Sequence, residues 1–284
     1  MGEHERKDWP RMSEWFELNR ANWDERAVPH ATSPRYEVEN FIADPDHLSH
    51  IIRFDRPRLG DLSGLRGVHL QCHIGTDTLS LHRLGARMTG LDFSEPALIQ
   101  ARDLATRTGA QIEYVRSGVY EALDVLPSGG FDLVFTGIGA LCWLPDIRRW
   151  AQVVAGLLAP GGRLFLREGH PALWAIDETR EDGLTLAYPY FEHVEPLIFD
   201  EPGTYVETTH VFTHTRTASW NHGLGEIVTA LLDVGLRITM LVEHDSVPWL
   251  ALPNQMDELA NGEYRLRDRP ERLPHSYTLQ ATTG

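Results

Sequence analysis

The sequence contains only two cysteines in 284 residues, Cys72 and Cys142. Both lie in apolar, strand-like runs, so we expect buried thiols and neither a disulfide nor a metal site. The sequence also lacks a secretory signal, a lipidation motif and any apolar run long enough to cross a bilayer. We therefore expect a cytoplasmic protein with no membrane partner.

Basic residues are also scarce: 26 Lys and Arg stand against 41 Asp and Glu, which gives a formal net charge of −15. Such a charge repels nucleic acids and anionic membranes. The 14 histidines are scattered without the paired spacing of a metal site. These features favour a small-molecule ligand and predict no metal.

The length suits one large domain with an added cap. We expect residues 1–60 to form an N-terminal helical lid, because several tryptophans there need a packing partner. Residues 28–36, which contain two prolines, are predicted to be a loop. Residues 61–284 would form the main domain, with insertions at about 170–218 and 246–274. The first insertion is rich in aromatic residues, and its alternating residues 204–213 predict a strand.

Residues 67–94 read as a strand, a turn, a helix and a second strand. Gly75 lies at the turn, where a missing side chain would let a ligand approach the backbone. The second strand ends in Asp92, whose carboxylate can accept two hydrogen bonds from a ribose diol. The segment therefore predicts a nucleoside-binding site.

This arrangement also occurs in dinucleotide-binding domains. A pyrophosphate, however, needs three glycines in the turn, and this turn has one. His73 and Ile74 stand where bare backbone would be required. The turn therefore argues against a dinucleotide.

Two segments carry a resemblance to a known family. Residues 85–94 read Gly-Ala-Arg-Met-Thr-Gly-Leu-Asp-Phe-Ser, and residues 158–162 read Leu-Ala-Pro-Gly-Gly before a strand at 163–168. Both resemble the class I S-adenosylmethionine (SAM) dependent methyltransferases. The first turn departs from that family, because its glycine-rich motif keeps only Gly75 and its acidic residue is replaced by His69.

The resemblance implies an α/β, Rossmann-like fold with a mostly parallel seven-stranded sheet, helices on both faces, the N-terminal cap and the aromatic insertion after the fifth strand. It also implies SAM as the cofactor. The residues expected to bind SAM are Tyr36, Gln71, His73, Gly75, Asp92, Phe93, Ser117, Gly118, Val119 and Gly137.

The end of the fifth strand is the expected place for a general base. His170 has a suitable ordinary pKa, and Glu168 is the second candidate. We expect Trp143, Trp174, Tyr190 and His222 to bind the acceptor, since amphipathic side chains suit a flat, partly polar molecule.

These features predict a SAM-dependent methyltransferase, monomeric or homodimeric, that acts on nitrogen or oxygen of a small metabolite in secondary metabolism. Three alternatives remain open at this point. They are a SAM-binding protein of the same fold that catalyses a cyclisation or elimination, an NAD(P)-dependent oxidoreductase, and a non-enzymatic SAM-binding regulator.

Overall fold

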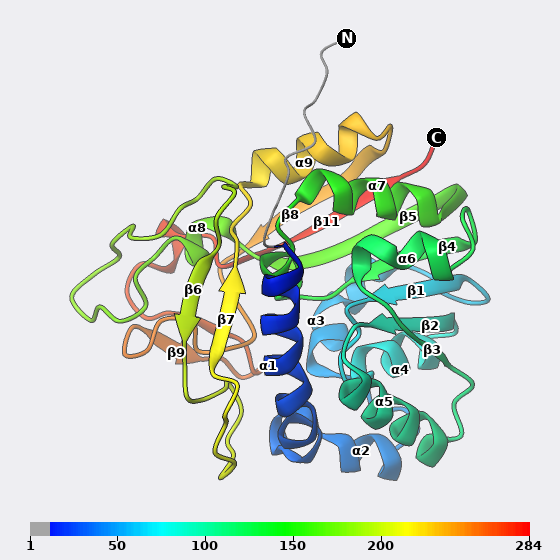
Figure 1. Cartoon of the computed structure of the whole chain (residues 1–284), viewed down its shortest axis with the longest axis horizontal. Coiled ribbons are helices and arrows are strands. Elements are labelled where there is room, and N and C mark those ends of the chain that lie inside the picture. The colour runs from blue at the N-terminus through cyan, green and yellow to red at the C-terminus, as the bar shows by residue number, and fades with distance from the viewer. Residues whose placement is uncertain (1–11) are drawn as a thin grey trace.

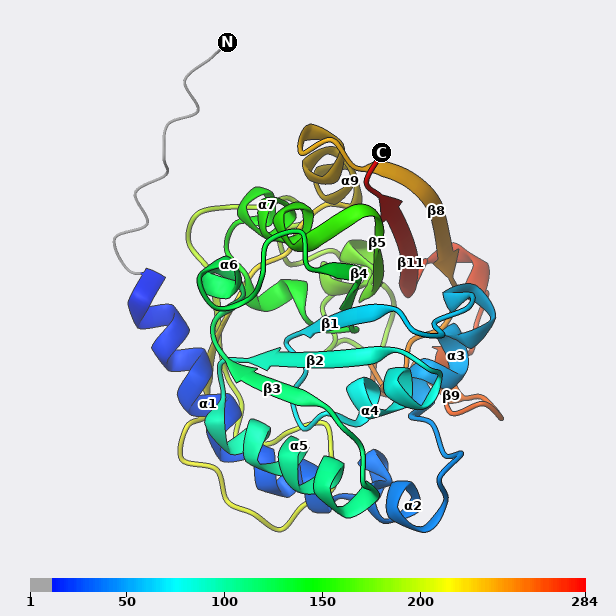
Figure 2. The same cartoon turned by 90° about the vertical axis from the view of Figure 1, so that its right-hand side faces the viewer.

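The computed structural model describes residues 12–284, which build an α/β structure around one central sheet (Figures 1 and 2). The sheet has seven strands in the order β3-β2-β1-β4-β5-β11-β8. Its strands are β1 (Arg66–Leu70), β2 (Arg87–Asp92), β3 (Glu113–Arg116), β4 (Phe131–Thr136), β5 (Leu158–Gly169), β8 (Arg237–His244) and β11 (Ser276–Thr282).

The strands from β3 to β5 are parallel, whereas β11 is antiparallel to both of its neighbours, β5 and β8. The predicted fold, a mostly parallel seven-stranded sheet, is confirmed. In this sheet β11 lies between β5 and β8. The strand order therefore differs from that of dinucleotide-binding domains, in which the sixth strand lies directly beside the fifth.

Helices cover both faces of the sheet, as Figure 2 shows. On one face, α3 (His50–Leu59), α4 (Thr76–Arg83) and α5 (Glu95–Thr108) pack against strands β1 to β5. On the other face lie α6 (Ala122–Val125), α7 (Ile147–Leu157) and α9 (Leu224–Asp233). Helix α3 falls within the predicted cap of residues 1–60, but it packs in the core against the sheet. Only the part of that cap before α3 remains a candidate for the lid.

The helix α7 illustrates how local sequence sets these elements. The Asp146 side chain accepts hydrogen bonds from the backbone N–H groups of Arg148 and Arg149 and so caps the helix start. Trp150, Val154 and Leu157 follow at helical spacing and are completely buried. The cap and the apolar stripe together fix where α7 begins and which face it presents to the sheet.

The N-terminal segment is more regular than predicted. Helix α1 (Met12–Thr32) runs through Pro29, so the loop expected at 28–36 is wrong over its first half. A proline inside a helix costs about 3 kcal/mol. Ala27 and His30, on either side of it, are both completely buried, and this packing offsets the cost. Residues 1–11 of the predicted cap lie outside the described residues.

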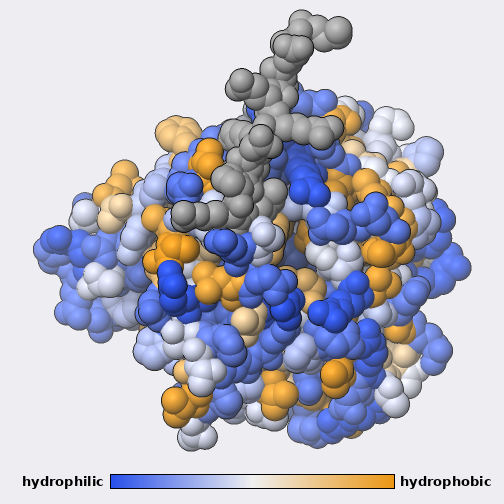
Figure 3. All heavy atoms as spheres, in the orientation of Figure 1, coloured by the Kyte–Doolittle hydropathy of each residue, from blue (hydrophilic) through white to orange (hydrophobic). Residues whose placement is uncertain are grey.

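The chain between α1 and α3 contains a short 3-10 helix at Pro34–Tyr36 and α2 (Val38–Ala43). Further 3-10 helices lie at Val119–Glu121, Leu141–Trp143 and Pro270–Arg272. No helix among residues 12–284 is long and apolar enough to span a membrane. On the face shown in Figure 3, hydrophobic side chains form small groups among hydrophilic ones.

Both predicted insertions contain short strands outside the main sheet. The first holds α8 (Pro171–Trp174) and the hairpin of β6 (Leu197–Asp200) and β7 (Arg216–Ser219). The strand predicted at 204–213 is wrong, because this stretch is the irregular connection between β6 and β7. The second insertion contains the pair β9 (Met256–Glu258) and β10 (Tyr264–Leu266).

Helix α1 is attached to the first insertion by the side chain of Asn19. Its amide donates to the carbonyl oxygen of Ala218 in β7 and accepts from the N–H of Ala218, both at 2.8 Å. The two groups are far apart in sequence, and Asn19 is buried. In Figure 1, α1 accordingly runs beside β7.

We expect Asn19→Ala to lower the free energy of unfolding by about 1–3 kcal/mol, because two backbone groups of Ala218 lose their partner in a buried position. Denaturant unfolding measures this change, and hydrogen exchange at Ala218 should accelerate. The control is Glu17→Ala, an exposed position two residues earlier on α1. Equal stability of the two variants would contradict the role of Asn19.

Candidate functional site

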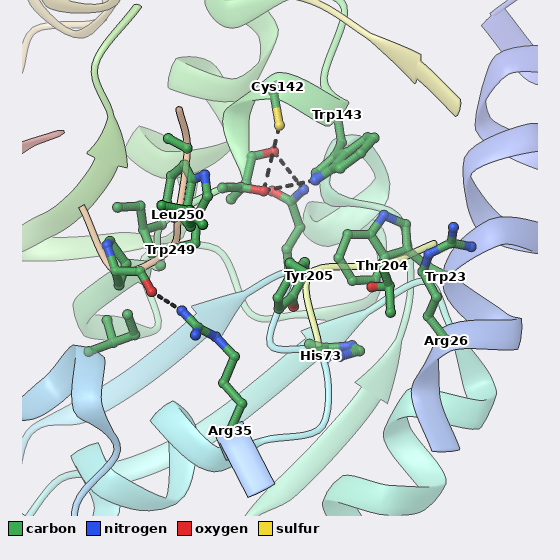
Figure 4. A pocket seen from close by; sticks show the side chains of 18 of the residues that line it. Trp23, Arg26, Arg35, His73, Cys142, Trp143, Thr204, Tyr205, Trp249 and Leu250 are labelled. Atoms are coloured by element: carbon green, nitrogen blue, oxygen red, sulfur yellow. Dashed lines mark hydrogen bonds between the residues drawn. The ribbon is translucent and has the colours of Figure 1, made fainter. Parts of the chain in front are cut away.

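A cavity of about 950 Å³ lies at the carboxyl ends of β1, β2 and β4 (Figure 4). Ligands of open α/β sheets bind at this edge. The volume is at the upper end of the range of about 300–1,000 Å³ that is typical of small-molecule sites. It therefore leaves space for two small molecules side by side.

The turn after β1 forms one wall of the cavity. Gln71, His73 and Gly75 all have positive φ angles, of 57°, 49° and 81°. The resembled family places glycines at these positions, and the backbone here keeps the left-handed conformation although two of the three residues carry side chains. The side chains of Gln71 and His73 fasten the turn: Gln71 Nε2 donates to the carbonyl oxygen of Ala140 at 2.9 Å, and His73 Nε2 lies 2.9 Å from His30 Nδ1.

Gly75 has a different role from the one expected. A Cβ at this position would lie 2.6 Å from the Tyr114 hydroxyl and 2.9 Å from the Ala101 Cβ. The missing side chain thus makes space for the packing of β3 and α5, and Gly75 does not line the cavity.

Asp92 lines the cavity at the end of β2 and is 4% exposed. Its Oδ2 accepts from the N–H of His73 at 2.8 Å, and its Oδ1 accepts from the N–H of Ser94 at 2.9 Å. Burial raises the pKa of Asp92 to about 6. Each oxygen retains acceptor capacity, so the carboxylate can still receive hydrogen bonds from a ligand diol.

The predicted cofactor-binding residues divide into two groups. Those that line the cavity are Tyr36, Gln71, His73, Asp92, Phe93 and Gly137. Those that do not are Gly75, Ser117, Gly118 and Val119. In the second group, the Val119 side chain is buried in the core against α6 and α7.

Rings from three separate segments cover the cavity. Trp23 and His30 come from α1, His73 from the turn after β1, and Tyr205 from the first insertion; the ring centroids of His73 lie 5.1 Å from Trp23 and 5.0 Å from His30. His30 Nε2 lies 2.8 Å from the hydroxyl of Thr204. Burial lowers the pKa of His30 to about 2 and that of His73 to about 3, so both are neutral at physiological pH.

This roof is the main feature that the sequence analysis missed. His30 was not singled out, and Thr204 and Tyr205 lie in an irregular stretch whose position no periodicity reveals. Figure 4 shows Trp23 and Arg26 entering from α1 beside Thr204 and Tyr205. Arg26 donates to the carbonyl oxygens of Gly203 at 2.8 Å and His214 at 3.1 Å, which joins α1 to the insertion.

Glu168 is buried at the end of β5 and does not line the cavity. Its carboxylate accepts four backbone N–H groups: those of Gly139 and Gly169 at 2.6 Å, and those of Ala140 and Leu141 at 2.8 Å. Burial raises its pKa. Glu168 therefore holds the loop after β4 in place, and its oxygens are engaged in that task.

His170 also lies outside the cavity lining. Its Nδ1 accepts from the N–H of Ala172, and its Nε2 lies 2.9 Å from Glu243 Oε1. Both ring nitrogens thus face protein groups, and the structure does not bring His170 to the place expected of a base.

His222 and Tyr190, two of the predicted acceptor residues, likewise do not line the cavity. His222 Nδ1 lies 3.0 Å from Glu192 Oε2, and its Nε2 lies 2.7 Å from the carbonyl oxygen of Leu144. The Tyr190 hydroxyl accepts from the N–H of Leu224 at 3.3 Å. Their contacts connect the first insertion to the loop before α7 and to the start of α9.

The other two predicted acceptor residues, Trp143 and Trp174, do line the cavity. Trp174 stacks on Trp249 of the second insertion, with ring centroids 5.3 Å apart and planes at 22°. Trp143 donates its indole N–H to the carbonyl oxygen of Gly139 and packs edge-on against Trp23. The stacked Trp174 and Trp249 thus give the cavity an aromatic end, whereas Trp143 lies with Trp23 beside the turn after β1 (Figure 4). No cluster of three or more metal-ligating side chains occurs among residues 12–284.

Comparison with known proteins identifies the class. Residues 68–164 match the family model described as "Methyltransferase domain". The ubiquinone biosynthesis O-methyltransferase of Cronobacter sakazakii is 35% identical over 108 residues, which cover 38% of this chain and 44% of that protein. The chain spans about half the length of the curated relatives it matches.

Solved structures agree on the fold. A SAM-dependent methyltransferase from Mesorhizobium loti superimposes with a TM-score of 0.52 at 20% identity, over 82% of this chain and 98% of that one. The [4+2]-cyclase SpnF has a TM-score of 0.50 at 16% identity, over 81% and 77%. Residues 68–164 thus match a methyltransferase domain, and the chain has the fold of the class I, SAM-dependent methyltransferases.

The residues at the cavity fit SAM. Asp92 is a buried carboxylate that faces the cavity with acceptor capacity to spare, as a ribose requires. His69, which is buried in β1, has an Nε2 without a hydrogen-bond partner beside the cavity. When bound, SAM supplies an activated methyl group on a sulfonium, and the protein residues hold its two ends.

We expect Asp92→Asn to weaken binding of 5′-methylthioadenosine, the nucleoside part of the cofactor, by about 10- to 100-fold at pH 8, because hydrogen bonds to a charged group are lost.

In the unsubstituted protein, the affinity for 5′-methylthioadenosine should fall by about tenfold per pH unit below about pH 6, as the carboxylate with its raised pKa takes up a proton. Asp92→Asn should lack this dependence. Calorimetry measures both, with Asp103→Asn, an exposed position on α5, as the control. Unchanged affinity in folded Asp92→Asn would place the ribose elsewhere.

Proposed function

We infer that the protein transfers a methyl group from SAM to nitrogen or oxygen of a small metabolite. One observation carries this proposal: a single cavity of about 950 Å³ is lined both by Asp92 and by the aromatic end at Trp174 and Trp249. A cofactor and an acceptor can therefore lie in contact within one enclosure. The O-methyltransferase activity of the curated relatives supports oxygen as the acceptor atom.

Methyl transfer is an in-line displacement on an activated donor. The protein has to align the two molecules and exclude water. The roof of Trp23, Tyr36 and Tyr205 suits this task, because it closes the cavity over the turn after β1. The buried ring of His30 packs against all three of these rings and supports them. We assign to α1 and the first insertion together the role of the lid.

The acceptor end indicates the character of the acceptor. Trp174, Tyr188, Phe199 and Trp249 present rings to the cavity, and Arg35 reaches it from below the roof. Such rings suit a flat molecule with apolar faces and a few polar groups. A small metabolite of this kind is consistent with secondary metabolism, the setting predicted from the sequence.

The turnover test uses the full chain with SAM and a pooled set of phenols, catechols and aromatic amines. We expect S-adenosylhomocysteine to accumulate together with an acceptor whose mass has increased by CH₂. SAM binding without S-adenosylhomocysteine, with an acceptor rearranged at unchanged mass, would support instead the non-methylating alternative, which the likeness to the [4+2]-cyclase SpnF keeps open. Binding without any conversion would favour a regulator.

We expect Trp249→Ala to raise the acceptor KM by about three- to tenfold, because the acceptor loses an aromatic contact worth about 0.5–1.5 kcal/mol. The affinity for S-adenosylhomocysteine should stay unchanged, since Trp249 lies at the acceptor end. Steady-state kinetics and calorimetry separate the two quantities. A loss of cofactor affinity with the acceptor KM unaltered would contradict the assignment of the two ends.

A further inference from the structure

A polar gap lies in the cavity wall where β1 and β4 end. A Cβ on Gly137 would lie 3.4 Å from His69 Nε2 and 3.6 Å from Asp77 Oδ2. Both atoms therefore lie beside the same face of Gly137, where no side chain stands between them and the cavity. All three residues line the cavity.

His69 presents an unsatisfied nitrogen to this gap. The residue is 2% exposed, its Nδ1 lies 2.9 Å from the hydroxyl of Thr78, and its Nε2 has no hydrogen-bond partner. In the tautomer whose Nδ1–H donates to Thr78, Nε2 carries a free lone pair that faces the gap. Burial lowers the pKa of His69 to about 3, so the ring stays neutral.

Asp77 contributes a negative charge that no ion pair compensates among residues 12–284. The charge of Arg167 acts on it without forming an ion pair, and the side chain of Ser49 hydrogen-bonds to it. Desolvation raises its pKa to about 6, so it is mainly ionised at neutral pH. A half-buried carboxylate beside an unpartnered ring nitrogen and an open space suits a donor that carries positive charge.

We propose that His69 and Asp77 form an ammonium-binding site that takes the α-ammonium group of the methionine end of the cofactor. An ammonium has three N–H donors and can satisfy Asp77 Oδ2 and His69 Nε2 at once. This inference rests on the proposed function and deepens it. It also accounts for the departure at position 69: the negative charge that the resembled family places on the first strand comes here from Asp77, in the first turn of α4.

The distance between the gap at Gly137 and the carboxylate of Asp92 agrees with one molecule bound at both. His69 pairs with Gly90 of β2 on one side and with Phe135 of β4 on the other. Asp92 follows Gly90 by two residues on β2, and Gly137 follows Phe135 by two residues on β4. The gap and the ribose carboxylate are thus two strands apart, about 10 Å. A nucleoside with an amino-acid tail spans such a distance.

The test compares two ligands that differ in the amino-acid part. S-adenosylhomocysteine carries the ammonium group, and 5′-methylthioadenosine lacks it. We expect Asp77→Asn to raise the dissociation constant of S-adenosylhomocysteine by about 10- to 100-fold, the loss of one charge-assisted hydrogen bond, while that of 5′-methylthioadenosine changes less than about twofold. The matched control, Asp92→Asn, should weaken both ligands.

Gly137→Ala provides a second variant that keeps Asp77 in place. The φ angle of Gly137 lies outside the left-handed region, so alanine is compatible with the backbone, and its methyl group would enter the gap. It should weaken S-adenosylhomocysteine selectively, and it decides the question if Asp77→Asn does not fold.

Three results would overturn the inference. Equal effects of Asp77→Asn on both ligands would show that Asp77 acts on the nucleoside or on the fold, and no effect on either would remove Asp77 from the site. If the unsubstituted protein bound neither ligand, the proposed function itself would fail.

Discussion

The carboxylate of Glu168 organises the edge of the sheet on which the site depends. It accepts four backbone N–H groups, three of them in the loop after β4, and so fixes the path of residues 139–141. That loop in turn provides the carbonyl oxygens of Ala140 and Gly139 that receive the side chains of Gln71 and Trp143. One buried carboxylate at the end of β5 thereby sets the relative positions of the turn after β1 and Trp143. Because its oxygens accept these four N–H groups, they are not free for proton transfer.

The site combines a scaffold made of regular elements with a roof made of irregular ones. The scaffold presents two carboxylates, Asp92 after β2 and Asp77 in the first turn of α4, on opposite sides of the turn after β1. The roof joins α1 to residues 203–205 through Arg26 and His30. Neutral histidines suit that place, since charged rings would be poorly solvated beneath the roof. We therefore propose that the sheet edge recognises the cofactor, while contacts between segments far apart in sequence enclose the cavity.

The sequence predicted the sheet correctly and placed the turn after β1 and Asp92 at the end of β2, because strand alternation, helix caps and the glycine after a strand are local signals. Ser94 and Asp146, for example, cap their helices with their own side chains. The errors occur where tertiary contacts override local preference: α1 continues through Pro29, and residues 204–213 form no strand. His170 stands at the expected end of β5, but whether a side chain turns toward the cavity or toward Glu243 depends on its neighbours in space. The left-handed angles of Gln71 and His73 were likewise invisible, because both residue types usually avoid that conformation.

We propose that the carboxyl ends of β1, β2 and β4 hold S-adenosylmethionine beside an acceptor. A crystal structure of the full chain with S-adenosylhomocysteine is the decisive measurement. We expect the ribose hydroxyls within hydrogen-bond distance of both Asp92 oxygens, the amino-acid tail under Gly137, and the sulfur directed toward the aromatic end at Trp174 and Trp249. A ribose bound away from Asp92, or a ligand outside this cavity, would contradict it.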